Sequence, residues 1–269
     1  MRFLIAGAFS KSVPIMQFLS TYAGTDDIVV YDGINKCPWN GGRINRDVYY
    51  SDGLINYYYK KGVKIALTLS NHNIDLTNEI GNHLLEKFHQ EGNALIIVND
   101  SLRQYVRERF PKYDLIYSIT GMGHLNIPLQ DSDIKWYKDL ESKYDWIVPR
   151  FEHIFDKRAT ELDRSKWEVM VNDTCIWKCK YFEEHFKAIA DENTAGRPYS
   201  KEVEECWLPK FDPNIESKYP CMDIDSEHLG KLVDLGVRSF KITGREMGDT
   251  EFAYDLNRYI SRVRALTSW

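Results

Sequence analysis

The chain has 269 residues, 43% of them hydrophobic, which is enough to build a sizeable core in a single α/β barrel. Its net charge of −5 gives no overall attraction to nucleic acid, although a local basic channel is compatible with it. Ser10, Lys11 and Pro14 interrupt the N-terminal apolar run and no later stretch approaches the length of a membrane span, so we expect a cytoplasmic protein that does not associate with membranes.

Eight short apolar runs recur along the chain and alternate with helical patterns. Nearly continuous apolar runs are typical of buried parallel strands. The expected strands are Arg2–Gly7, Asp27–Tyr31, Lys64–Leu69, Ala94–Asn99, Leu115–Ile119, Trp146–Arg150, Trp167–Val171 and Ser239–Thr243. This count predicts an α/β fold, a TIM-like (β/α)8 barrel that forms one domain over residues 1–269. An open doubly wound sheet is the alternative, and the absence of a G-x-G-x-x-G fingerprint after the first strand disfavours it.

Three helices have clear sequence signals. Ser101 to Gln104 forms a capping box that predicts a helix ending at Phe110, before Pro111. Asp225 is expected to cap a helix that ends at Gly236. The last helix has an apolar face at helical spacing, made of Phe252, Leu256, Tyr259, Ile260 and Val263.

The seventh strand leads directly into a cysteine-bearing insertion. Cys175 and Cys179 follow the strand, and Cys206 lies in the stretch from Asp191 to Tyr219, which has no clear periodicity. Cys221 comes just before the helix that precedes the last strand. Four thiolates that meet at the mouth of a barrel suit an iron–sulfur cluster.

The remaining cysteine and a histidine leave alternatives open. Cys37 follows the second strand, so it is expected at the same mouth, where it could replace Cys206 or Cys221 as a ligand. A zinc site that includes His185 is a second interpretation. A third is that several cysteines are small buried apolar side chains. With five cysteines and no secretory signal, a disulfide framework is disfavoured.

The last strand carries a basic pair. Lys241 lies within the strand and Arg245 just past its end, where they could hold a carboxylate or phosphate. The alternative is that Lys241 pairs with a core carboxylate and Arg245 is a solvated loop residue.

The segments Cys221–Leu229 and Leu235–Arg245 together resemble the signature of the collagenase-like peptidase family U32. In that family a cysteine, a short helix and a strand ending in a K-I-E-G-R pattern close the barrel. This chain has Thr243 where the family usually has glutamate, which puts in doubt any acid–base role of that glutamate. Gly41, Gly42 and Arg43 after the second strand also agree with the family.

The resemblance implies a function. Members of the family include oxygen-independent hydroxylases that act on RNA bases or quinone precursors, and their cysteines hold a 4Fe-4S cluster. By position, Cys175 and Cys221 match best and Cys179 and Cys206 match less exactly, whereas Cys37 resembles a ligand that one branch of the family has after its second strand. The resemblance therefore implies four ligands drawn from these five cysteines. The chain is thus expected to be an iron–sulfur enzyme of this type, with Lys241 and Arg245 at its site. Peptidase activity and a non-catalytic binding module with structural zinc are the alternatives.

Other residues can be placed by the same reasoning. The substrate is expected to be a small anionic molecule or RNA, and a protein partner is neither required nor excluded. The run Tyr57–Gly62 is read as a packed helix face with a basic last turn, on the far side of the barrel from the mouth. The mouth should also carry polar residues that can equally be caps or strand-end hydrogen bonders: Asn71, His72, Asn99, Asp100, Glu152 and Asn172.

Overall fold

The computed structural model describes residues 1–44, 49–176, 178–200 and 221–267. Within these residues, eight parallel strands form the main sheet, and each corresponds to a strand expected from the sequence. Their bounds are β1 Arg2–Ala6, β2 Asp27–Asp32, β3 Lys64–Thr68, β4 Ala94–Ile97, β5 Asp114–Tyr117, β6 Trp146–Ile147, β7 Glu168–Met170 and β10 Ser239–Ile242.

The sheet curls into a nearly closed barrel. Its strand order is β6-β5-β4-β3-β2-β1-β10-β7, so β6 and β7 are the two ends of the sheet. A parallel bridge between Ile147 and Trp167 joins these ends. The prediction of a TIM-like barrel is therefore confirmed, and the open doubly wound sheet is excluded.

Side chains alternate between the two faces of each strand, as the pleat requires. In β1, Phe3 and Ile5 join the large apolar cluster under the helices, whereas Leu4 and Ala6 belong to a smaller cluster inside the barrel. Lys241 of β10 stands in register with Leu4 of β1 and Met170 of β7. Lys241 therefore occupies an inward position.

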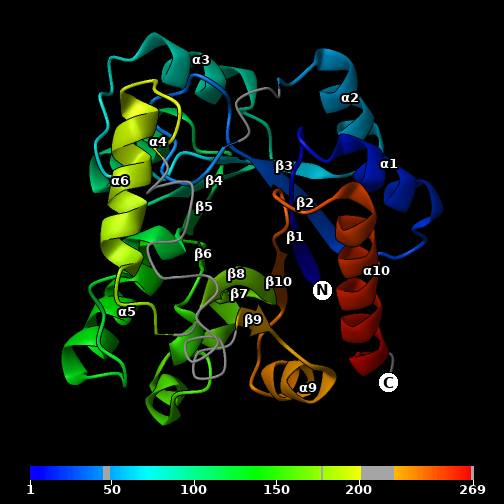
Figure 1. Cartoon of the computed structure of the whole chain (residues 1–269), viewed down its shortest axis with the longest axis vertical. Coiled ribbons are helices and arrows are strands. Elements are labelled where there is room, and N and C mark those ends of the chain that lie inside the picture. Colours follow the sequence, from blue (N-terminus) through cyan, green and yellow to red (C-terminus); the bar gives the residue numbers. More distant parts are fainter. Residues whose placement is uncertain (45–48, 177, 201–220, 268–269) are drawn as a thin grey trace.

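The helices cover the outside of the barrel, and α1 and α10 lie side by side (Figure 1). None of the helices in the described ranges is long and apolar enough to cross a membrane. The α-helices are α1 Ser12–Thr21, α2 Asp52–Lys60, α3 Glu79–Lys87, α4 Asp100–Arg109, α5 Asp131–Lys143, α6 Phe182–Thr194, α9 Ser226–Asp234 and α10 Asp249–Leu266, and the 3-10 helices are η1 Ile119–Gly121, η2 Phe151–His153, η3 Lys157–Glu161 and η4 Arg164–Lys166.

Most helix signals in the sequence are confirmed. The Asp225 side chain accepts a hydrogen bond from the His228 N–H at the start of α9, and Gly236 has a φ of 97° just past its end. The apolar face predicted for the last helix is buried in α10. The expected capping box at Ser101 is wrong, because Asn99 caps α4 by accepting from the Leu102 N–H, two residues earlier.

The segment between β7 and β10 adds structure above the barrel. β8 Asn172–Ile176 pairs antiparallel with β9 Cys221–Asp223, with Ile176 opposite Cys221. The stretch expected to be irregular from Asp191 begins inside helix α6, which continues to Thr194. The rest of that stretch from residue 201, including Cys206, lies outside the described residues.

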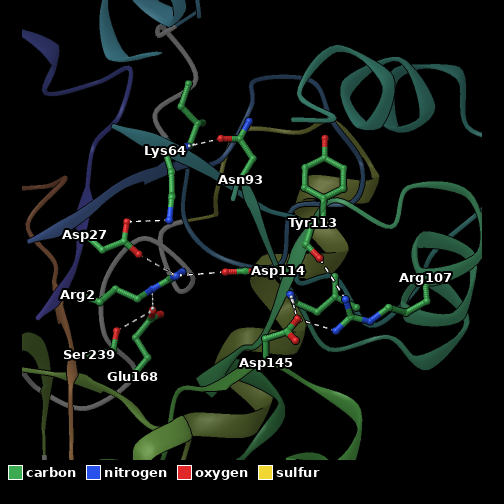
Figure 2. Close-up of polar contacts among 12 residues, drawn as sticks. Arg2, Asp27, Lys64, Asn93, Arg107, Tyr113, Asp114, Asp145, Glu168 and Ser239 are labelled. Atoms are coloured by element: carbon green, nitrogen blue, oxygen red, sulfur yellow. Dashed lines mark hydrogen bonds and ion pairs between the residues drawn. The ribbon is translucent and has the colours of Figure 1, made fainter. Parts of the chain in front are cut away.

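The end of the barrel opposite the mouth is closed by an ionic network around Arg2 (Figure 2). The Arg2 side chain, 5% exposed, lies 3.2 Å from Asp114, 3.5 Å from Asp27 and 3.5 Å from Glu168. Its guanidinium also stacks on the Trp146 ring, 4.6 Å from the ring centroid. One side chain of β1 thus links β2, β5, β6 and β7 across the interior.

The run Tyr57–Gly62 ends α2 and leads into β3, away from the mouth. Tyr58 is fully buried and its hydroxyl donates to the Ala8 carbonyl. Gly62 has a positive φ after the basic last turn. The interpretation as a packed helix face is confirmed.

Candidate functional site

A pocket of about 100 Å³ lies at the carboxyl ends of the barrel strands. This is the end at which (β/α)8 enzymes place their active sites. Cys175, Lys241 and Arg245, three of the residues singled out in the sequence, all line it. The strands that follow one another around the barrel therefore bring together residues that are far apart in the chain.

Lys241 presents its ammonium group to this pocket from inside the barrel. Its Nζ lies 4.5 Å from the centroid of the Tyr31 ring, and the side chain is 5% exposed. Burial lowers the pKa of Lys241 to about 8, although the Glu168 carboxylate opposes this shift. Lys241 can therefore attract an anion and exchange a proton near neutral pH.

Arg245 is held by a carboxylate beneath the pocket. Its Nη1 lies 3.4 Å from Asp32 Oδ1, and its guanidinium faces the same Tyr31 ring. Asp32 is itself fixed, because its Oδ2 accepts from the N–H groups of Phe9 and Ser10 and from the Ser10 hydroxyl. The alternative, in which Arg245 is a solvated loop residue, is wrong, since its side chain is 17% exposed and paired with Asp32.

Arg43 supplies a third cation to the pocket lining. It follows Gly41 and Gly42, and its Nη2 lies 3.1 Å from His185 Nε2. A side chain at Gly41 would meet the Ser70 carbonyl oxygen at 1.9 Å, so only glycine allows this close approach. The glycine pair thus lets the loop pack against the end of β3 and brings Arg43 to the mouth.

Hydroxyl groups line another part of the pocket. Thr68 and Ser70 come from the end of β3, whereas Ser118 and Thr120 follow β5. The Thr120 hydroxyl donates to Ser118 Oγ at 3.1 Å. In the described residues, Thr68 Oγ1 and Ser70 Oγ are buried and have no hydrogen-bond partner.

Cys175 lies in β8 at the edge of the pocket, and its N–H donates to Asp173, a further pocket residue. Cys179 is half-buried and lies beyond the pocket lining. The backbone of Cys221 in β9 lies opposite Ile176, next to Cys175 in the chain. Cys206 lies outside the described residues.

No protein-family model matches the sequence, and no curated protein is significantly similar to it. The solved structure of the U32 peptidase Mk0906 aligns with 92% of this chain and 94% of its own, with a TM-score of 0.57. The fold of the chain is therefore similar to that of this U32 peptidase. At 10% identity the likeness is one of fold, and at that level it confirms the resemblance carried by Cys221–Arg245.

Cys37 does not line the mouth pocket of the barrel. It is 1% exposed within the apolar core, and burial raises the pKa of its thiol to about 11. This differs from the expectation that it projects at the mouth. A thiol in such surroundings behaves as a small apolar side chain.

The described part of the barrel holds no group of three or more His, Cys, Asp or Glu side chains that could bind a metal ion. Two of the four expected thiols, those of Cys206 and Cys221, are not among the described side chains. His185, the alternative zinc ligand, contacts Arg43.

Polar residues that were expected at the mouth mostly hold its loops. The Asn71 amide donates to the carbonyls of Pro38, Asn40 and Ala190 and to Thr194, and Asn99 caps α4. Asp100 pairs with Arg103, and Glu152 with Arg150. Asn172 bonds the Thr243 backbone, and His72 lines a separate hollow beside Trp39. Apart from His72, these side chains hold local structure, as the alternative proposed.

Sequence reasoning missed Asp32, Thr68 and Ser70. Thr68 and Ser70 stand two residues apart at the end of an apolar run, and this spacing puts two hydroxyls on one face of an extended chain. This alternation of hydroxyl residues was the sequence signal that could have indicated them. For Asp32 the sequence has no such signal, because its partner Arg245 lies far away in the chain.

Proposed function

We propose that this chain is an iron–sulfur enzyme of the U32 type, an oxygen-independent hydroxylase or related modifying enzyme. It binds an anionic substrate at the barrel mouth beside a 4Fe-4S cluster held by Cys175, Cys179, Cys206 and Cys221. The observation that carries the proposal is that Cys175, Lys241 and Arg245 line one pocket.

The donor set is compatible with such a cluster. Cys175 sits at the pocket, and the pairing of β8 with β9 brings the backbone of Cys221 to the neighbouring strand. Lys241 and Arg245 supply positive charge to the same pocket. When bound, the cluster would supply a redox or Lewis-acid centre.

The chain's own residues would bind and orient the substrate. Arg245, anchored by Asp32, offers a planar fork for a carboxylate or phosphate, and Lys241 adds a point charge. The barrel interior below the pocket is apolar, with Ile96 and Met170 in its lining. An apolar surface beside the cations strengthens their attraction for an anion.

The solved relative's name makes peptidase activity the second candidate. Peptide hydrolysis by a cysteine or serine requires a base within hydrogen-bond reach of the nucleophile. No histidine is among the described residues that line the pocket. The pocket therefore gives less support to hydrolysis than to binding of a small anion.

The test is iron, sulfide and zinc analysis with an absorption spectrum of the anaerobically purified chain. We expect iron and sulfide with broad visible absorption, both lost in Cys175→Ala and kept in the matched control Cys37→Ala. Stoichiometric zinc without colour would favour a structural-metal module instead. Absence of any metal under strict anaerobiosis would exclude the cluster.

A further inference from the structure

Two hydroxyl groups at the end of β3 point to what the mouth pocket binds. Thr68 is 7% exposed and Ser70 is fully buried, and both line the pocket. Within the described residues neither hydroxyl has a hydrogen-bond partner. Burying a hydroxyl without a partner is unfavourable, so a protein that keeps two of them at one site needs a compensating interaction there.

The hydroxyls are held on rigid backbone. Gly41 packs directly against the Ser70 carbonyl, and the Leu69 N–H donates to the Ile96 carbonyl at 2.9 Å. The next residue, Asn71, is fully buried and its amide bonds four groups on other segments. The backbone that carries the Ser70 hydroxyl is therefore fixed at the pocket, which is the property of a preformed binding group.

The neighbouring hydroxyls behave differently. Ser118 Oγ accepts hydrogen bonds from both the N–H and the hydroxyl of Thr120, so this pair is internally satisfied. In the sheet, β2 and β1 separate β3 from β10, which places Thr68 and Ser70 across the barrel from Lys241. Lys241 lies on one side of the pocket, whereas the β3 side offers two hydroxyls that have no partner among the described residues, beside the loop that carries Arg43.

We propose that Thr68 and Ser70 form a hydroxyl subsite for the polar end of a small anion whose charged group is held by Lys241 and Arg245. The ligand class is a carboxylate or phosphate ester with a hydroxyl or carbonyl oxygen at its other end. The proposal rests on the proposed function for the location of the anion. The pocket volume of about 100 Å³ suits a ligand of a few heavy atoms or one such group of a larger molecule.

The experiment compares probes that differ by one hydroxyl, using calorimetry on the anaerobically purified chain. 3-Hydroxypropionate is compared with propionate, and 3-hydroxypropyl phosphate with propyl phosphate, so the two arms distinguish a carboxylate from a phosphate. We expect the hydroxylated probe of at least one pair to bind about tenfold tighter, because the site otherwise leaves its hydroxyls unpaired.

The double variant Thr68→Val/Ser70→Ala should lose this discrimination while its melting temperature rises, since it removes two buried hydroxyls without partners. The control Thr21→Val lies in α1, and its hydroxyl donates to the Phe18 carbonyl at 3.1 Å. It should keep the discrimination and melt at a slightly lower temperature. If Thr68 and Ser70 had only a structural role, the double variant would not lose ligand discrimination and gain stability at the same time.

Equal discrimination in the wild type and the double variant would overturn the subsite, as would a double variant that melts below the wild type. Iron and sulfide are measured on the same samples. A preparation with the cluster but no discrimination overturns the subsite alone. A preparation that discriminates without any cluster overturns the proposed function alone.

Discussion

Lys241 occupies an inward position of a barrel strand, where apolar side chains are the rule. Its register neighbours are Leu4 and Met170, and Glu168 lies two residues before Met170 on the same inward face. Burial lowers the pKa of Lys241 to about 8, with Glu168 limiting the shift. The charged lysine therefore destabilises the folded chain, and a bound anion would relieve this cost.

The pH dependence of stability follows from that shift. Between pH 8 and the ordinary lysine pKa of about 10.5, the unfolded chain holds a proton that the folded chain lacks, so stability rises with pH in this window. Lys241→Met should be more stable than the wild type by about 1 to 3 kcal/mol at pH 7. Urea denaturation of the two proteins from pH 7 to 10 measures the rise in wild-type stability and the difference between the variant and the wild type.

The difference in unfolding free energy between Lys241→Met and the wild type should shrink as the pH rises through this window. Asp173, Arg245 and Glu168 also act on Lys241, but all three are present in both proteins. A difference that stays constant with pH would mean that the lysine keeps its ordinary pKa.

At the scale of elements, the strands were predictable because each is a local apolar run bounded by polar residues. Caps that depend on one nearby side chain, such as Asp225, were equally predictable. The predicted start of α4 was wrong because Asn99 and Ser101 are both residues that cap helices well. Which of them caps α4 depends on where the preceding strand β4 ends. Local sequence cannot show where a neighbouring strand ends.

The site was predictable only in part for the same reason. Lys241 and Arg245 stand in one strand signal, and Cys175 follows another, so all three could be assigned to the mouth. The burial of Cys37 depends on how its loop folds back onto the core, which involves residues distant in sequence. The Asp32–Arg245 pair likewise forms only when the barrel closes.

The loop after β2 gives a prediction at this scale. A Cβ at Gly41 would lie 1.9 Å from the Ser70 carbonyl oxygen, whereas a Cβ at Gly42 would meet nothing within 4 Å. Gly41→Ala should therefore cost about 2 to 3 kcal/mol of stability, and Gly42→Ala less than about 0.5 kcal/mol. Thermal and urea unfolding of the two variants measure this contrast. Equal losses would mean that the loop does not approach β3 so closely.

At the scale of the whole molecule, charged side chains fill both ends of the barrel interior. The mouth has Lys241 and Arg245, and the opposite end has Arg2 with Asp27, Asp114 and Glu168 (Figure 2). Glu168 is fully buried, and its pKa is raised by burial although Arg2 and Lys241 oppose the shift. Arg2 thus stabilises the buried Glu168 carboxylate in its charged form.

Removal of Arg2 should destabilise the whole barrel. Arg2→Met leaves Glu168 without its nearest cation and should cost about 3 to 5 kcal/mol in urea denaturation. The double variant Arg2→Met/Glu168→Gln should recover part of this loss, because the uncompensated charge is gone. If the stability loss of the double variant equalled the sum of the losses of the two single variants, the two side chains would not interact.

The most direct measurement is diffraction at the iron absorption edge from crystals of the anaerobically purified chain. We expect anomalous density from a compact group of iron atoms beside Cys175, facing the pocket that Lys241 and Arg245 line. Iron at another place, or no anomalous density beside Cys175 in protein kept free of oxygen, would contradict the proposal that this barrel mouth is an iron–sulfur active site.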